Sequence, residues 1–218
     1  VREEVRTRID TELILSQNWN AQWESDFKPV EVDDLLYIYA PFHEKKEGFK
    51  QSIIIQPQMS FGTGHHQTTW MISKFMFSLD LKDNKVLDVG TGTGVLAILA
   101  HQLQASNVVA TEIDEISFNN AKENIELNNI KDIEVLYGDI DVVDTTNFDV
   151  IIANINSNVL KSHLEKYSAL IVENGTLILS GFFSSDENDL ITWANRYGFK
   201  YEQKLNKEGW SMLCLKKG

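Results

Sequence analysis

A glycine-rich turn is the first segment whose composition indicates chemistry. Residues 88–94 (DVGTGTG) follow the apolar run 85–89, and their glycines allow a tight turn and close approach of a ligand to bare backbone. A dinucleotide site needs G-x-G-x-x-G, but Val95 stands at the third glycine position. The spacing and the preceding acid favour a positively charged ligand without a pyrophosphate, although a plain strand-to-helix turn is the alternative. The candidate ligand-binding residues of this turn are Asp88, Gly90, Thr91, Gly92 and Gly94.

Acidic residues follow the next two predicted strands. Glu112 lies near the end of the strand 107–113, where its carboxylate could accept hydrogen bonds from both hydroxyls of a ribose, and we include the adjacent Ile113 in the site. The alternative for Glu112 is a solvated strand end, and Asp114 is better explained as a helix N-cap.

A second acid follows the strand 133–137. Asp139 could accept from the exocyclic amine of adenine, with Ile140 packing on the ring, although this segment by itself could be a simple turn. The glycine turn and the two acids, taken together and in order at strand ends, predict an adenosine site.

An asparagine ends the predicted strand 148–154 (FDVIIAN). The side-chain carbonyl of Asn154 could accept a hydrogen bond from a substrate amine and aim its lone pair. The alternative is an asparagine that simply terminates a strand.

The segment 61–69 (FGTGHHQTT) precedes a predicted helix. Its two glycines, placed among hydroxyl and aromatic residues, indicate a loop that could close over a ligand. The adjacent histidines have no cysteine or acid at ligand spacing, so we predict no metal site. Thr68 and Thr69 could cap the helix.

The elements that position these residues alternate between strands and helices from residue 85 onward. This pattern predicts an α/β three-layer sandwich around a Rossmann-like, seven-stranded, mainly parallel sheet with an antiparallel last strand. One helix should carry Leu160, Leu164, Tyr167 and Ile171 and end at Asn174-Gly175. Ligands of such sheets bind at the carboxyl ends of the strands. The predicted strands are 85–89, 107–113, 133–137, 148–154, 176–180 and an antiparallel pair near 199–205 and 210–216.

The first sixty residues do not follow this alternation. Residues 1–27 predict a helix with Trp19, Trp23 and Phe27 on one face, and 34–40 and 52–56 predict the strands of a β-hairpin. We therefore divide the chain into residues 1–60, a linker helix and hairpin, and residues 61–218, a catalytic domain.

Composition narrows the possible partners. The net charge of −12 over 218 residues disfavours direct contact with nucleic acid and suits a basic protein, although acidity could simply aid solubility. No apolar run of 18 residues or charged-then-apolar leader occurs, so we expect no membrane contact. The single cysteine, Cys214, fits a reducing compartment. We expect a cytoplasmic monomer.

The motifs FGTG-x-H-x-TT, V-L-D-V-G-x-G-x-G and A-N-I together strongly resemble the ribosomal protein L-eleven methyltransferase (PrmA) family of class I methyltransferases. The resemblance implies S-adenosylmethionine as methyl donor and S-adenosylhomocysteine as product. It implies that the glycine turn holds the amino-acid end of the cofactor, Glu112 the ribose, and Asp139 with Ile140 the adenine. Phe61, Thr63, Gly64 and His66 would line the entrance and Asn154 would face the methyl group, so that Asn154, Thr63 and His66 become the catalytic candidates.

The implied substrate is an amine nitrogen of a protein, either a lysine side chain or an N-terminal amine, and the implied protein is ribosomal protein L-eleven. The sequence departs from the family at His65, Gln67 and Glu173-Asn174. The family also carries a separate N-terminal recognition domain, of which we expect only the connecting helix within residues 1–27. The alternatives are a different protein or small-molecule amine as substrate, or a non-catalytic cofactor-binding module. A nicotinamide-dependent oxidoreductase is disfavoured by Val95 and by the FGTG segment.

Overall fold

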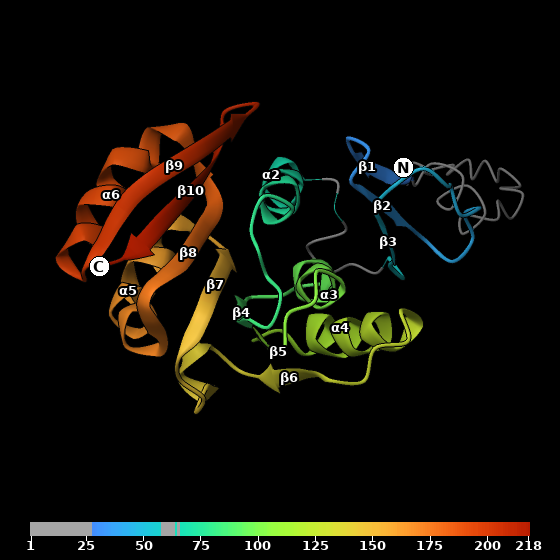
Figure 1. Ribbon diagram of the computed structural model, residues 1–218, viewed down its shortest axis with the longest axis horizontal. Coiled ribbons are helices and arrows are strands. Elements are labelled where there is room, and N and C mark those ends of the chain that lie inside the picture. Colours follow the sequence, from blue (N-terminus) through green and yellow to red (C-terminus); the bar gives the residue numbers. More distant parts are fainter. Residues whose placement is uncertain (1–27, 58–63, 65) are drawn as a thin grey trace, which may run out of the picture.

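Apolar runs of the sequence form a seven-stranded sheet in the computed structural model, which describes residues 28–57, 64 and 66–218 (Figure 1). The strand order is β6-β5-β4-β7-β8-β10-β9. The pairs β6–β5, β5–β4, β4–β7 and β7–β8 are parallel, and β10 runs antiparallel to both of its neighbours. This confirms the predicted fold class. The strands are β4 (Lys85–Val89), β5 (Asn107–Glu112), β6 (Ile133–Tyr137), β7 (Phe148–Asn154), β8 (Ile171–Phe183), β9 (Phe199–Lys207) and β10 (Trp210–Lys217).

Helices cover both faces of this sheet (Figure 1). Successive residues of β7 alternate between two cores: Val150 and Ile152 pack with α2, α3 and α4, whereas Ile151 and Ala153 pack with α5 and α6. Burial on both faces explains why the central strands read as continuous apolar runs. The helices are α2 (Gln67–Met76), α3 (Val95–Gln102), α4 (Glu115–Leu127), α5 (Ser157–Leu170) and α6 (Glu187–Arg196), with the short 3₁₀ turns η1 (Ile140–Val142) and η2 (Ser184–Asp186).

A second, three-stranded sheet corrects the predicted pairing near the N-terminus. It contains β1 (Val30–Val32), β2 (Leu36–Tyr39) and β3 (Gln51–Ile54). The predicted hairpin of 34–40 with 52–56 is wrong, because β2 and β3 pair in parallel, and β2 forms its hairpin with β1 instead. The long segment 40–50 gives the chain room to cross back and bring β3 in the same direction as β2, which a tight turn cannot do. The predicted helix of residues 1–27 lies outside the described residues, and the boundary at residue 60 stays a prediction.

Two asparagines, one on α4 and one at its C-cap, connect the small sheet to the glycine turn. Asn128 accepts from the amide of Ile54 and donates to its carbonyl, so the side-chain amide acts like the edge of a strand. One turn earlier, Asn124 accepts from the amide of Gln56 and donates to the carbonyl of Thr93. The spacing of four residues places these side chains on one face of α4. The chain that leaves β3 is therefore fixed to the same helix as the turn 90–94.

The end of α5 also differs from the prediction. The helix ends at Leu170, and Ile171 already begins β8 with a ψ of 147° at the cap. Asn174, with a φ of 60°, does not terminate the helix but lies within an irregularity of the β7–β8 pairing. The β-branched pair Ile171-Val172 favours extended backbone, which explains the earlier transition. Within the described residues, no helix is long and apolar enough to cross a bilayer.

Candidate active site

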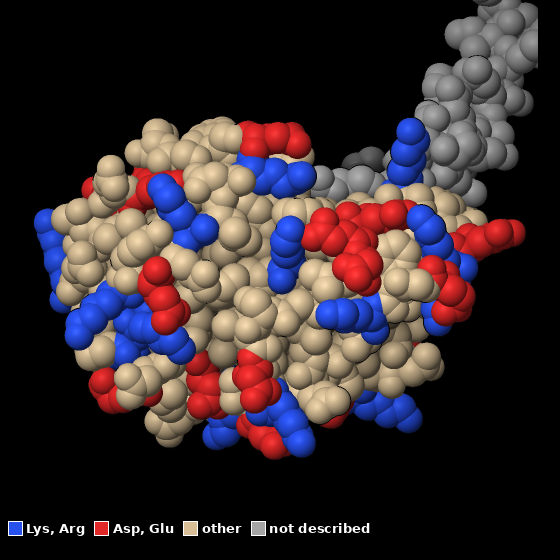
Figure 2. Space-filling view, turned by 45° about the horizontal axis from the view of Figure 1, so that its top comes forward, with Lys and Arg blue, Asp and Glu red and all other residues tan. Residues whose placement is uncertain are grey.

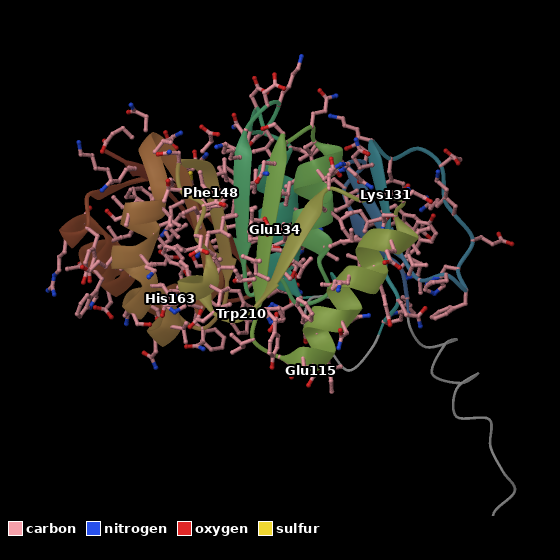
Figure 3. All side chains as sticks on the ribbon, turned by 90° about the horizontal axis from the view of Figure 1, so that it is seen from below. Glu115, Lys131, Glu134, Phe148, His163 and Trp210 are labelled. Atoms are coloured by element: carbon pink, nitrogen blue, oxygen red, sulfur yellow. The ribbon has the colours of Figure 1, made fainter. Side chains whose placement is uncertain are left out.

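A cavity of about 600 Å³ opens at the carboxyl ends of the central strands. Figure 3 shows the arrangement: Glu115, His163 and Trp210 lie toward one edge of the large sheet, and Phe148 and Lys131 lie toward the opposite edge. The cavity belongs to the first of these edges, where parallel strands of an open α/β sheet bind ligands. Its lining includes His66, Thr69, Val89, Gly90, Thr91, Gly92, Val95, Leu96, Thr111, Glu112, Ile113, Asp114, Ser117, Gly138, Asp139, Asn154, Ile155, Asn156, Val159, Gly181 and Trp210.

The charge of this lining is acidic. Glu112, Asp114 and Asp139 contribute carboxylates, and the lining contains no lysine or arginine among the described residues. Low-dielectric walls that carry charge of one sign favour a ligand of the opposite sign. The cavity is therefore suited to a cationic ligand and poorly suited to a pyrophosphate.

The glycine turn between β4 and α3 brings bare backbone to the cavity wall. Gly90 has a φ of +71°, and a Cβ built on it would lie 2.5 Å from a methyl of Ile155. The amides of Gly90 and Thr91 both donate to the carbonyl of Thr111 on β5. Glycine is needed at residue 90 because both the backbone conformation and the space exclude a side chain.

Asp88 supports this turn from behind. Its side chain is 1% exposed and does not line the cavity, and the Thr91 hydroxyl donates to Oδ2 at 2.6 Å. Burial raises the pKa of Asp88 to about 6, against the lowering effect of hydrogen bonds from Thr91 and the amide of Ala97. Asp88 therefore acts on the shape of the turn, where the sequence pattern had suggested direct contact with the ligand.

Glu112 at the end of β5 is held almost entirely by main-chain amides. Oε2 accepts from Gly92 at 2.9 Å, and Oε1 accepts from Ile113 at 2.9 Å and from Asp114 at 3.0 Å. A carboxylate has about four acceptor positions. Three of them are filled within the described residues, which fixes the plane of the carboxylate and leaves an acceptor position on Oε2. Asp114 itself caps α4 by accepting from the amide of Ser117.

Asp139 follows β6 and lines the next part of the cavity. Its Oδ1 accepts from the amide of Ile140 at 2.7 Å, and Oδ2 lies 3.2 Å from Nε2 of His163. Ile140 is 2% exposed and packs in the core below, whereas Ile113 is 67% exposed and lines the cavity. The apolar contact that the sequence pattern assigned to Ile140 is therefore better placed at Ile113.

Asn154 also lines the cavity, and its side-chain amide is only partly hydrogen-bonded within the described residues. The amide nitrogen of Asn154 donates to the Thr69 hydroxyl at 3.3 Å. Its side-chain oxygen is buried and accepts no hydrogen bond from any described residue. A buried polar atom without a partner costs free energy, and Asn154 belongs to the cavity lining, so a ligand that donates to this oxygen would remove that cost.

His66 and Trp210 form the wall beside Asn154. The His66 ring caps α2 by accepting from the amide of Thr68, and its centroid lies 4.4 Å from the Trp210 ring in an edge-on arrangement. Thr68 and Thr69 are thus inside the first turn of α2, and the cap is His66. Partial burial lowers the pKa of His66, so the imidazole is neutral near pH 7. Trp210 also stacks on Phe183 at 4.2 Å.

Comparisons with known proteins identify the family of the chain. A family model described as Ribosomal protein L11 methyltransferase (PrmA) matches residues 2–218. The chain belongs to this family. Curated proteins named Ribosomal protein L11 methyltransferase include one from Porphyromonas gingivalis, 42% identical over 198 residues, covering 90% of this chain and 68% of that protein. Another, from Clostridium perfringens strain 13, is 32% identical over 212 residues, covering 95% of this chain and 67% of that protein.

Solved structures match the fold. The crystal structure of a ribosomal protein L11 methylase from Lactobacillus delbrueckii subsp. bulgaricus superposes with a TM-score of 0.82 at 29% identity, covering 88% of this chain and 99% of that one. A methyltransferase from Pyrococcus furiosus gives a TM-score of 0.64 at 23% identity over 76% of this chain and 89% of that one. At that identity, the second match supports the fold alone.

The cavity of this PrmA family member gathers most of the residues that the sequence singled out. His66, Gly90, Thr91, Gly92, Glu112, Ile113, Asp139 and Asn154 line it. Asp88, Gly94 and Ile140 lie outside the lining, and Gly64 packs against β2, where a Cβ would lie 2.6 Å from Ile38. Phe61 and Thr63 lie outside the described residues.

Sequence reasoning missed Thr69 as a partner of Asn154, and it missed Trp210 and Gly181 as parts of the wall. Trp210 reaches the cavity because antiparallel β10 begins at the edge where the parallel strands end, and a pattern of strand ends gives no signal for that. Gly181 lies beside Ile155, where a Cβ would come within 2.3 Å of the Ile155 carbonyl oxygen. A glycine flanked by apolar strand residues at 177–183 was the available signal for a close approach of backbone.

Proposed function

We propose that this PrmA family member transfers the methyl group of S-adenosylmethionine to an amine nitrogen of a protein, and that the protein is ribosomal protein L11. The observation that carries the proposal is the side-chain oxygen of Asn154, which has no partner among the described residues and belongs to a residue that lines an acidic cavity. A cationic ligand fits the carboxylates, and an amine with N–H donors fits Asn154. The names of the curated relatives support the choice of protein.

We assign the cofactor contacts as follows. The bare backbone at 90–92 would receive the amino-acid end of the cofactor, Oε2 of Glu112 one ribose hydroxyl, and Asp139 the adenine amine, with Ile113 on the ring. When bound, the cofactor supplies a methyl group already activated by a positively charged sulfur. We also propose that Phe61 and Thr63 line the entrance to the cavity.

The chain's own residues then have to align and desolvate the substrate. Asn154 accepts from the amine and directs its lone pair, while Thr69 holds the asparagine amide and His66 with Trp210 excludes water from that side. Alignment of this kind can contribute about 7–11 kcal/mol to a displacement. A lysine ammonium, with an ordinary pKa of about 10.4, must first lose its proton, and desolvation in the cavity lowers that pKa.

Surface charge does not by itself select the substrate. On the face shown in Figure 2, acidic and basic side chains are interspersed and no large single-sign patch appears. Recognition of a lysine-rich protein would therefore depend on the acidic cavity and on residues around its mouth, helped by the overall net charge of −12. Such a substrate would place the reaction in the cytoplasm, and we propose that the chain acts as a monomer, without contacting nucleic acid, through residues 61–218.

The experiment is methylation of purified ribosomal protein L11, read by intact mass, with binding of S-adenosylhomocysteine measured on the same preparation. We expect mass increments of one methyl group or more. Binding without methylation would reject L11 as the substrate, and a mixture of amine-bearing small molecules would then be the next test. Absence of cofactor binding would reject the methyltransferase assignment itself.

A further inference from the structure

We call the part of the cavity lined by Glu112, Ile113 and Asp139 its adenosine end. Behind it, α5 carries two buried polar side chains that the proposed reaction does not use. His163 is 8% exposed, and Tyr167, one helical turn later, is fully buried. Nε2 of His163 lies 3.2 Å from Oδ2 of Asp139, and the Tyr167 hydroxyl lies 3.4 Å from Nδ1 of His163. Figure 3 shows His163 at the same edge of the sheet as the cavity residue Trp210. The three side chains form one continuous row from the core to the cavity.

The direction of the hydrogen bonds in this row follows from its two ends, a carboxylate that can only accept and a hydroxyl that keeps its proton. Burial, and then the nearby charge of Asp139, raises the pKa of Tyr167 far above its usual value, so its hydroxyl keeps the proton. A neutral histidine has one donor and one acceptor nitrogen. Because the Asp139 carboxylate can only accept, Nε2 carries the ring proton and donates to it, and Nδ1 of the neutral ring accepts from the Tyr167 hydroxyl.

The row limits the motion of a carboxylate that would otherwise be free to rotate. The Asp139 side chain is 50% exposed, yet Oδ1 is held by the amide of Ile140 and Oδ2 by His163. With one donor on each oxygen, the plane of the carboxylate is fixed before a ligand arrives. The acceptor positions that are left belong to a group that lines the cavity. Ordering a binding group in advance removes the cost of ordering it during binding.

We propose that His163 and Tyr167 are positioning residues that hold Asp139 as an acceptor and thereby make the site selective for a purine with a 6-amino group. This inference rests on the proposed function, in which Asp139 receives the adenine amine. A 6-oxo purine presents an oxygen where Asp139 also presents oxygens, so a rigid acceptor rejects it more strongly than a mobile one. The competing explanation is that the two residues only satisfy each other inside α5, in which case selectivity would not depend on them.

The test compares binding of S-adenosylhomocysteine and S-inosylhomocysteine by calorimetry. The two ligands differ in the 6-amino and 6-oxo groups. His163→Leu keeps the bulk of the side chain and removes both nitrogens, whereas His163→Gln restores a donor and an acceptor. Tyr167→Phe removes the hydroxyl that favours the proton on Nε2 of His163. Asp139→Asn tests the acceptor itself. The matched control is His101→Leu. His101 lies on α3, outside the cavity lining, and its Nε2 is 2.9 Å from Oδ1 of Asp132.

We expect the wild type to prefer the adenosine ligand. His163→Leu should weaken its binding about tenfold while weakening the inosine ligand little, so that most of the preference is lost. Tyr167→Phe should show about a threefold effect of the same sign, His163→Gln should recover most of the preference, and His101→Leu should leave both affinities unchanged. In turnover, His163→Leu should raise KM for the cofactor and leave kcat unchanged, because the lost contact stabilises the bound cofactor equally before and during the transfer.

The outcomes distinguish failure of the positioning role from failure of the proposed function. An unchanged preference in folded His163→Leu and Tyr167→Phe, checked by thermal unfolding, would overturn the positioning role even if Asp139→Asn abolishes the preference. A wild type that binds S-adenosylhomocysteine without preference, or an Asp139→Asn variant that keeps it, would reject Asp139 as the acceptor and the inference with it. A wild type that binds neither ligand would reject the proposed function. If His163→Leu does not fold, Tyr167→Phe and His163→Gln decide the question.

Discussion

The two ends of the cavity differ in how fully the protein satisfies its own polar atoms. At the proposed adenosine end, Glu112 accepts from three backbone amides and Asp139 accepts from one amide and one histidine. At the proposed methyl-transfer end, the oxygen of Asn154 is buried with no partner among the described residues. One end is built before the ligand arrives, and the other keeps an acceptor available.

This difference matches two different tasks. A group that must bind a cofactor strongly in every turnover benefits from being held in place, because less order has to be imposed during binding. A group that aims a substrate amine must instead make its best hydrogen bond with the reacting atom, and an internal partner would compete with that bond. The comparison predicts that substitutions at the two ends affect different kinetic constants.

The largest effect should come from Asn154→Ala at the transfer end. Loss of a single hydrogen-bonding group aimed at reacting atoms lowers kcat by about 10²–10³-fold in well-studied cases, and we expect a loss in that range. The affinity for S-adenosylhomocysteine should change by less than about threefold. The control is Asn158→Ala, an exposed position on α5. If calorimetry showed that Asn154→Ala lost cofactor affinity in proportion to activity, the division of tasks would be wrong.

A second prediction concerns Asp88, which supports the glycine turn, and its effect on the free energy of unfolding at different pH values. The pKa of Asp88 is raised from 3.8 to about 6 by burial, so between these values the folded protein holds a proton that the unfolded chain releases. The free energy of unfolding of the wild type should therefore fall as pH rises, relative to Asp88→Asn. At 1.36 kcal/mol per pKa unit the full fall is about 3 kcal/mol, of which about 2 kcal/mol should occur between pH 4 and 6. Asp88→Asn keeps an acceptor for Thr91 and cannot ionise.

The measurement is urea unfolding of both proteins without cofactor at pH 4, 5, 6, 7 and 8. The difference between the two curves isolates Asp88 from the other titrating groups. A difference that stays constant across this range would mean that Asp88 ionises normally, and that the turn is not built over a protonated carboxyl near pH 5.

At the adenosine end, Glu112→Gln should act mainly on binding. The amide would place a donor among three backbone donors, and hydrogen bonds to a charged acceptor contribute about 1.5–3 kcal/mol each. We expect the dissociation constant for S-adenosylhomocysteine to rise about tenfold to a hundredfold, with kcat at saturating cofactor retained within about threefold. Glu126→Gln, at an exposed position of α4, is the control. A fall in kcat at saturation with unchanged affinity would contradict the comparison.

Much of this architecture could be predicted because short stretches of sequence determine it. Apolar runs became buried parallel strands, and Asp114 capped α4 as its position suggested. Polar residues at the ends of different strands were brought to one edge because parallel strands end on the same side. Glycine spacing and the acids at 112 and 139 were therefore sufficient to locate the cavity.

The parts that could not be predicted depend on contacts between distant segments. The parallel pairing of β2 with β3 depends on the path of the segment 40–50 and on the asparagines of α4 that hold residues 54–56. His163 reads in the sequence as one residue of a helix, and only the packing of α5 brings it to Asp139. Trp210 reaches the cavity because β10 lies between β8 and β9; the antiparallel pair near 199–205 and 210–216 was predicted, but its position beside β8 was not.

The smallest expected effect tests whether the transfer end also needs some internal order. Thr69→Val keeps the shape of a fully buried side chain but removes the hydroxyl that accepts from the Asn154 amide at 3.3 Å. The asparagine would then be less well oriented, and an ordinary hydrogen bond of about 0.5–1.5 kcal/mol corresponds to a loss of about threefold to tenfold in kcat. Cofactor affinity should not change. Thr192→Val on α6, whose hydroxyl bonds only to its own helix at Asn188 among the described contacts, is the matched control. If single-turnover methylation by Thr69→Val equals that of the wild type, Asn154 aims the amine without Thr69, and all of the internal order of the cavity then belongs to its adenosine end.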